Sequence, residues 1–193
     1  MAEGHPASTT RKITNPQVMR AMAHPARMEI MEYLGSTGEG VTATECAALV
    51  GLSPSATSYH LRELARYGLI EQAPSRGDAR ERVWHSTSQG WSVGGDLKEP
   101  EARAAEQGLI DVYLARDFAR IRNWFVAQPD APTQWREVSE LTGQVLLLTA
   151  DELREVNAAV REVLSPYRRR SRAADPPEGA RTVAVHYAAF PVD

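Results

Sequence analysis

The stretch that decides the fold is residues 53–70, SPSATSYHLRELARYGLI. Its serine-proline start is typical of a helix N-terminus, because serine caps free backbone amides and proline fits the first helical position. At 100° per residue, Thr57, Leu61 and Leu64 share one face, which predicts a buried stripe. Serine and threonine are mediocre helix formers, so the opposite face is expected to have a role beyond solvation. That face carries Ser55, Ser58, Tyr59, Arg62 and Arg66.

A second short helix is predicted just before this one, in TATECAALVGL (residues 42–52). Thr42 and Glu45 have the spacing of a capping box, and Gly51 is a typical helix stop. Two short helices joined by a turn of about three residues form a helix-turn-helix. Upstream, Asn15-Pro16 predicts a helix to about residue 23, and another is expected from about residue 26 to just before Gly35.

The chain downstream of the helix-turn-helix reads as a β-hairpin. Leu69, Ile70 and Ala73 predict a short strand, residues 74–80 a turn, and residues 82–85 a returning strand. A helix-turn-helix followed by a hairpin is a winged helix. The wing is basic at Arg76, Arg80 and Arg82. Arginines at this place usually contact phosphates or the minor groove, although Arg82 could instead pair with glutamates along the strand.

Residues 91–193 are expected to form a second region after the Gly/Ser-rich boundary SQGWSVGG. A long helix is predicted from about residue 100 to 128, followed by a strand at 138–148, a helix opened by Thr149 and Glu152, and a strand at 182–190. The long helix is either a dimer seam or a face packed on the chain's own sheet, with equal weight. Its apolar stripe consists of Ile110, Leu114, Phe118, Ile121 and Phe125.

The expected fold class is therefore α+β, with an N-terminal winged helix-turn-helix, a long helix and a small strand-helix-strand region. The expected organisation is a flexible arm over residues 1–14, the winged helix over 15–90, and a dimerisation or effector domain over 91–193. The aromatic residues Trp124, Trp135, Tyr167 and Tyr187 could line a pocket for a small organic effector, but core packing is the more ordinary reading.

Composition narrows the function classes. Apolar residues make up 42% and charged residues 24% of the 193, and no apolar run is long enough to span a membrane. The N-terminal residues lack the apolar core of a signal peptide, so we expect a cytoplasmic protein. Residues 1–90 hold equal numbers of basic and acidic residues, and the net charge of −3 comes from residues 91–193. Any DNA-binding surface must therefore be a local patch.

Metal and enzyme sites are not expected. The single cysteine, Cys46, occupies an apolar position of its helix and reads as a small core residue. The five histidines do not cluster in the sequence, and His60 borders the buried stripe. A zinc or nickel site needs three or four convergent donors. Nucleophile-elbow, phosphate-loop, dinucleotide and HExxH motifs are absent, so we expect no catalysis, cofactor or bound metal.

Three segments together resemble the ArsR-type winged-helix transcriptional regulators. They are AMAHPARMEIMEYL, then TATECAALVGLSPSATSYHLRELARYGLIE, then RGDARERVW, and the resemblance covers about residues 15–88. It implies a homodimer that binds an imperfect palindromic operator in double-stranded DNA, usually as a repressor released by an effector. The lone cysteine departs from the family's metal sensors, so a non-metal effector is expected.

The sequence thus predicts a DNA-reading face, in which hydroxyls and guanidiniums reach base edges and phosphates. The alternative from another class is a winged helix that docks a partner protein without specific DNA readout. The candidate DNA-binding residues are Thr44, Ser53, Ser55, Ser58, Tyr59, Arg62, Arg66, Arg76, Arg80 and Arg82.

Overall fold

The computed structural model of the chain describes residues 10–74 and 82–192. It forms two compact units, Met1–Arg116 and Asp117–Asp193. The division falls inside a long helix rather than at the glycine-rich stretch near residue 91. Over the described ranges, no helix is both long and apolar enough to cross a membrane.

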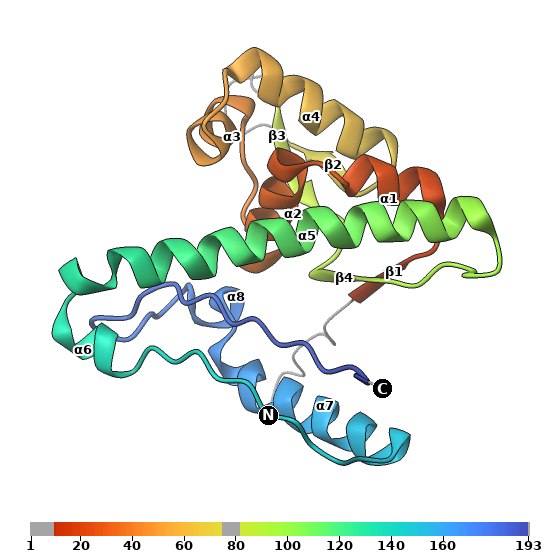
Figure 1. The fold of residues 1–193 in the computed structure, drawn as a ribbon. Helices are drawn as coiled ribbons and strands as arrows, with labels where there is room; N and C mark the ends of the chain where they lie inside the picture. Colours follow the sequence, from red (N-terminus) through yellow and green to blue (C-terminus); the bar gives the residue numbers. More distant parts are fainter. Residues whose placement is uncertain (1–9, 75–81, 193) are drawn as a thin grey trace, which may run out of the picture. The chain divides into compact units, whose positions relative to one another are not determined.

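The first unit begins its helical part with α1 (Pro16–Met22) and α2 (Pro25–Thr37) (Figure 1). Helix α1 starts as the sequence predicts, with proline in the first turn and a side-chain cap on the preceding residue, and α2 starts in the same way, at Pro25 rather than at about residue 26. The Asn15 side chain accepts from the amide of Gln17, and that of His24 accepts from the amide of Ala26. The expected stop at Gly35 is wrong. Helix α2 continues for almost another turn and ends at Gly38, whose φ of 72° is the left-handed value that glycine adopts without strain.

The helix-turn-helix consists of α3 (Ala43–Val50) and α4 (Pro54–Arg66). The capping box at the start of α3 is present in both directions between Thr42 and Glu45, as predicted. Gly51 ends α3 with a φ of 65°, and the Ser53 side chain caps α4. These local signals place α4 directly after α3.

Two pairs of short strands complete the first unit. Strand β2 (Ile70–Ala73) pairs antiparallel with β3 (Val83–Ser86), so the two strands of the predicted hairpin are confirmed. Most of its predicted turn, residues 75–81, lies outside the described residues. Strand β1 (Thr10–Ile13) pairs in parallel with β4 (Gly90–Val93), and the two lie side by side in Figure 1. The sequence placed β1 in a loose arm and β4 in a linker. Their pairing partner is about 80 residues away along the chain, so no local pattern reveals it.

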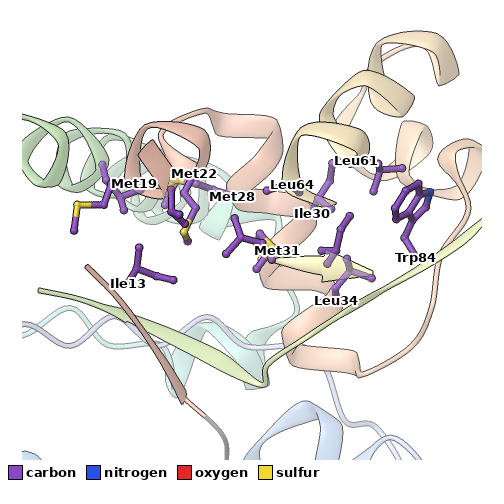
Figure 2. Packing of buried hydrophobic residues seen from close by; sticks show 14 of the residues in the cluster. Ile13, Met19, Met22, Met28, Ile30, Met31, Leu34, Leu61, Leu64 and Trp84 are labelled. Carbon is purple, nitrogen blue, oxygen red and sulfur yellow. The ribbon is translucent and has the colours of Figure 1, made fainter. Parts of the chain in front are cut away.

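One hydrophobic core holds these elements together. Figure 2 shows methionines of α1 and α2 lying beside leucines of α2 and α4, with Trp84 of β3 at one end. The predicted stripe of α4 is confirmed, because Thr57, Leu61 and Leu64 are fully buried. The buried face of the amphipathic helix α4 therefore fixes which residues its opposite face presents to solvent.

Helix α5 (Pro100–Ala127) belongs to the first unit through its N-terminal part. There it buries Ala102, Ala105 and Leu109. Arg116 forms an ion pair of 2.7 Å with Glu32 of α2, which adds a polar contact on the same side. The buried face is thus offset from the predicted apolar stripe, whose first member, Ile110, is exposed.

The second unit is helical wherever regular structure is assigned. It contains the rest of α5, then α6 (Thr133–Glu137), α7 (Ala150–Leu164) and α8 (Arg169–Arg172), with short 3-10 turns at Gln128–Asp130 and Ser165–Tyr167. The capping box that opens α7 is confirmed.

The strand-helix-strand expected around α7 is not what the structure shows. Over residues 117–192, neither 138–148 nor 182–190 forms a strand. The apolar run at the end of 138–148 and the apolar residues of 182–190 are compatible with strands. A strand, however, also needs a hydrogen-bonding neighbour, and neither segment meets one within this unit.

Candidate nucleic-acid interface

The polar face of α4 lies where the sequence predicts it. Ser55, Arg62 and Arg66 are exposed, and Tyr59 exposes 55% of its surface. Ser58 is half-buried. Because Thr57, Leu61 and Leu64 fill the opposite side, these polar side chains cannot turn into the core without unfolding the helix. Ser53 differs from the others, since its hydroxyl accepts from the amide of Ala56 at 3.2 Å and so acts as a helix cap.

A groove joins four of the predicted residues into one site. It lies at the start of α3, beside α4 and β3, and has a volume of about 260 Å³. Hydroxyl and guanidinium groups from three separate elements therefore converge on a single hollow. The predicted residues that line it are Thr44, Ser58, Arg62 and Arg82.

The rest of the groove is formed by residues that the sequence does not mark as candidates for DNA binding. Thr42, Ala43 and Trp84 also line it. Thr42 is held by the capping box, and Trp84 is held by two backbone hydrogen bonds to Val41, each of 2.8 Å. The capping pattern around Thr42 was visible in the sequence. The isolated bridge between Val41 and Trp84 was not, because it joins residues 43 positions apart.

Positive charge at the groove is largely uncompensated. Within residues 10–74 and 82–192, neither Arg62 nor Arg82 forms an ion pair with a carboxylate. Arg66 lies 3.8 Å from Glu63, a long and exposed contact that is worth little. The wing arginines Arg76 and Arg80 lie outside the described residues. The groove therefore presents two guanidiniums to solvent, an arrangement suited to an anion such as a phosphate.

A pair of histidine rings lies beneath α4. The rings of His24 and His60 have centroids 4.4 Å apart, and the His24 Nδ1 accepts from the amide of Ala26 at 3.2 Å. His60 is buried, and its Nδ1 has no hydrogen-bond partner among the described residues. Burial lowers the pKa of both histidines, and the charge of Arg27 adds to the effect. The contact between the two rings joins the residue that caps α2 to α4.

The remaining candidates do not gather into a second site. Ile110, Leu114 and Phe118 are exposed on α5, whereas Ile121 and Phe125 are half-buried. Groups of three or more His, Cys, Asp or Glu side chains able to hold a metal are absent from the described part of the chain.

Cys46 is a buried core residue, as the sequence predicts. Burial, with a smaller effect of the Glu45 charge, raises the pKa of its thiol to about 11. Among the aromatic residues of the second unit, Arg181 covers the ring of Trp135 and Arg172 that of Tyr167, at 5.4 and 5.2 Å. Those two rings thus stack with guanidiniums of their own unit.

Comparison with known proteins also identifies a helix-turn-helix in the first unit. Residues 22–73 match a family model described as a helix-turn-helix domain. A 69-residue segment, 36% of this chain, is 41% identical to the HTH-type transcriptional regulator YgaV of Escherichia coli. The chain covers 65% of that regulator, slightly less than two thirds of its length. The curated relative is named as a transcriptional regulator.

Two solved structures are similar to part of the chain. NolR from Sinorhizobium fredii is 33% identical, with 37% of this chain and 67% of NolR covered at a TM-score of 0.33. HlyU from Vibrio cholerae is 25% identical, with 50% and 85% covered at a TM-score of 0.32. TM-scores this low carry no argument about the fold of the chain. The chain thus contains a helix-turn-helix domain over residues 22–73 and is similar in this region to a bacterial transcriptional regulator.

Proposed function

We propose that the chain is a homodimeric, sequence-specific transcriptional repressor whose operator binding is modulated by a non-metal effector. The observation that carries the DNA-binding part is the groove, where Thr44 of α3, Ser58 and Arg62 of α4, and Arg82 just before β3 line one hollow. Such a groove suits a phosphate beside a recognition helix that reads the adjacent major groove.

The roles within the site follow from position on the fold. Ser55, Ser58 and Tyr59 present hydroxyls on the exposed side of α4 and would contact base edges or adjacent phosphates. Arg62 and Arg82 would hold the backbone at the groove. Arg66, Arg76 and Arg80 would add phosphate contacts along the helix and the wing, and Thr44 would approach the backbone from the start of α3. Ser53 would act through the helix cap that it forms.

The proposed homodimer would place one recognition helix on each half of the operator. Two recognition helices related by a two-fold axis contact half-sites about one helical turn apart, which requires a palindromic operator. The absence of net positive charge is consistent with this, because a local patch can supply the contacts without a basic protein.

The test begins with selection of bound duplexes from a random pool by the full chain, followed by titration of the winning sequence. Arg62→Ala should lower affinity for that duplex by about 1–3 kcal/mol and relax the sequence preference near one position. Arg103→Ala is the matched control, because Arg103 is exposed on α5 and does not line the groove. Its affinity should equal that of the wild type.

Two results would count against the proposal. If no sequence is enriched, or if binding barely depends on salt, the winged helix is better explained as a protein-docking module. If the R62A and R103A variants bind the selected duplex as tightly as the wild type, the groove is not the DNA site. Screening the selected complex against small organic molecules, with metal ions as a separate arm, tests the effector part.

A further inference from the structure

The second unit carries a compact group of arginines that takes no part in the groove of the first unit. This arginine cluster occupies the short helix α8 and the residue before it, directly after α7 and the turn Ser165–Tyr167 (Figure 1). All of its side chains are exposed. The members of the cluster are Arg168, Arg169, Arg170 and Arg172.

The charge of the cluster is opposite to that of the region around it. Residues 163–174 contain four arginines and no acidic residue, whereas residues 91–193 as a whole supply the net charge of −3. The nearest acidic residues along the chain, Glu162 and Asp175, lie outside the cluster on either side. Like charges this close repel one another, so a bound polyanion would relieve an unfavourable interaction within the folded unit.

Contacts within the chain leave much of this charge available. In the part of the chain that the structure describes, the side chains of Arg168 and Arg170 have neither an ion pair nor a hydrogen bond. Arg172 lies over the ring of Tyr167, with its guanidinium carbon 5.2 Å from the ring centroid. Tyr167 exposes 65% of its surface, so this stacked pair is open to solvent.

A stacked arginine beside two unpaired ones is suited to binding phosphates. Stacking uses the face of the planar guanidinium and leaves the N–H groups at its edge free to donate to the oxygens of one phosphate. A side chain that is already held in place also loses less entropy on binding. Arg168 and Arg170 supply further charges for neighbouring phosphates, because duplex DNA carries one negative charge per about 1.7 Å of its axis.

We propose that the arginine cluster is a second DNA-contacting surface, which binds the phosphate backbone of duplex DNA without reading its sequence. The proposal rests on the proposed function only in that the chain binds DNA. Once the groove of the first unit holds a duplex, the phosphates of that duplex are at a high effective concentration for the cluster. An anionic membrane is a poorer partner, because α7 next to the cluster carries Asp151, Glu152, Glu155 and Glu162, which such a surface repels.

The test uses the full chain with two duplexes of equal length, one containing the selected operator and one of random sequence. Arg168→Ala/Arg170→Ala should lower the affinity for both duplexes by the same factor, roughly tenfold or more at about 0.1 M salt. The slope of log affinity against log salt concentration should lose up to about 1.8 for each bound chain, since each phosphate contact contributes about 0.9. The ratio of the two affinities should not change.

Two further variants control for loss of charge and loss of structure. Arg154→Ala/Arg161→Ala removes two exposed arginines from α7 of the same unit, outside the cluster, and should bind both duplexes as the wild type does. Arg168→Lys/Arg170→Lys keeps both charges of the cluster. It should retain most of the salt slope, because phosphate contacts of this kind depend chiefly on charge.

Three results would overturn the proposal. The first is wild-type affinity and salt slope in the R168A/R170A variant, and the second is an equal loss in the R154A/R161A control. The third is weaker binding of R168A/R170A to vesicles of an anionic phospholipid with unchanged binding to DNA, which would assign the cluster to a membrane surface.

The R62A variant, measured on the same duplexes, separates this proposal from the proposed function. It should change the ratio of the affinities for the operator and the random sequence, which R168A/R170A leaves unchanged. An inactive R62A substitution beside a weakened R168A/R170A variant counts against the groove alone. The reverse result counts against the arginine cluster alone.

Discussion

The groove at α3, α4 and β3 leads to a quantitative prediction about two arginines acting on one phosphate. Arg62 and Arg82 line the same hollow although they come from different elements. We expect each single alanine variant to weaken operator binding by about 1–3 kcal/mol. That range corresponds to about 5- to 150-fold in the dissociation constant.

The salt dependence tests whether the two residues share a phosphate. Each neutralised phosphate contributes about 0.9 to the slope of log affinity against log salt concentration. If Arg62 and Arg82 hold one phosphate together, the double variant should lose about 0.9 from the slope. Two separate phosphates would give a loss of about 1.8. The coupling free energy between the two substitutions should likewise be about 0.5–3 kcal/mol.

The assay is fluorescence anisotropy of the selected duplex at four or more salt concentrations, for the wild type, both single variants and the double variant. The R103A variant controls for loss of a positive charge elsewhere. Strictly additive losses in free energy together with a slope change near two phosphates would refute the shared site. Wild-type slopes in all variants would remove the groove from the interface.

Three further predictions concern the first unit. Folding keeps His24 and His60 neutral by burial and by the charge of Arg27, so the unfolded state binds more protons below the ordinary histidine pKa of 6.5. The free energy of unfolding, measured in urea, should be constant above pH 6.5 and should decrease as the pH drops below it. The double variant His24→Asn/His60→Gln should show a smaller decrease, and its asparagine can still cap α2. Thr42→Ala should lower the free energy of unfolding by about 0.5–2 kcal/mol through loss of the capping box, whereas a variant as stable as the wild type would show that the cap contributes nothing. Cys46 should resist alkylation at pH 8 in the native protein and react after unfolding, and rapid native labelling would contradict its burial.

The helix-turn-helix could be predicted because its signals are local. Asn15, Thr42 and Ser53 each cap a helix within three residues of themselves, and Gly51 ends α3 by its own backbone conformation. The buried stripe of α4 follows from spacing alone. Such features require no knowledge of distant parts of the chain.

The features that the sequence did not reveal all depend on distant residues. Strand β1 pairs with a segment about 80 residues away, and the contact between the His24 and His60 rings joins two different helices. The groove could not be predicted either, because the bridge between Val41 and Trp84, which brings β3 to the start of α3, joins residues far apart in the chain. Conversely, residues 182–190 carry the alternation of a strand, but a periodic pattern cannot create the partner that a strand requires.

The two kinds of residue that line the groove bear on how the specificity of this chain can evolve. Thr42 and Trp84 are buried and maintain a helix cap and a backbone bridge, so changing them costs stability. Thr44 and Arg62 are exposed and have no such structural task. Substitutions at these exposed positions should therefore cost little stability, and if the groove binds DNA as proposed, its sequence preference can change while the scaffold stays the same.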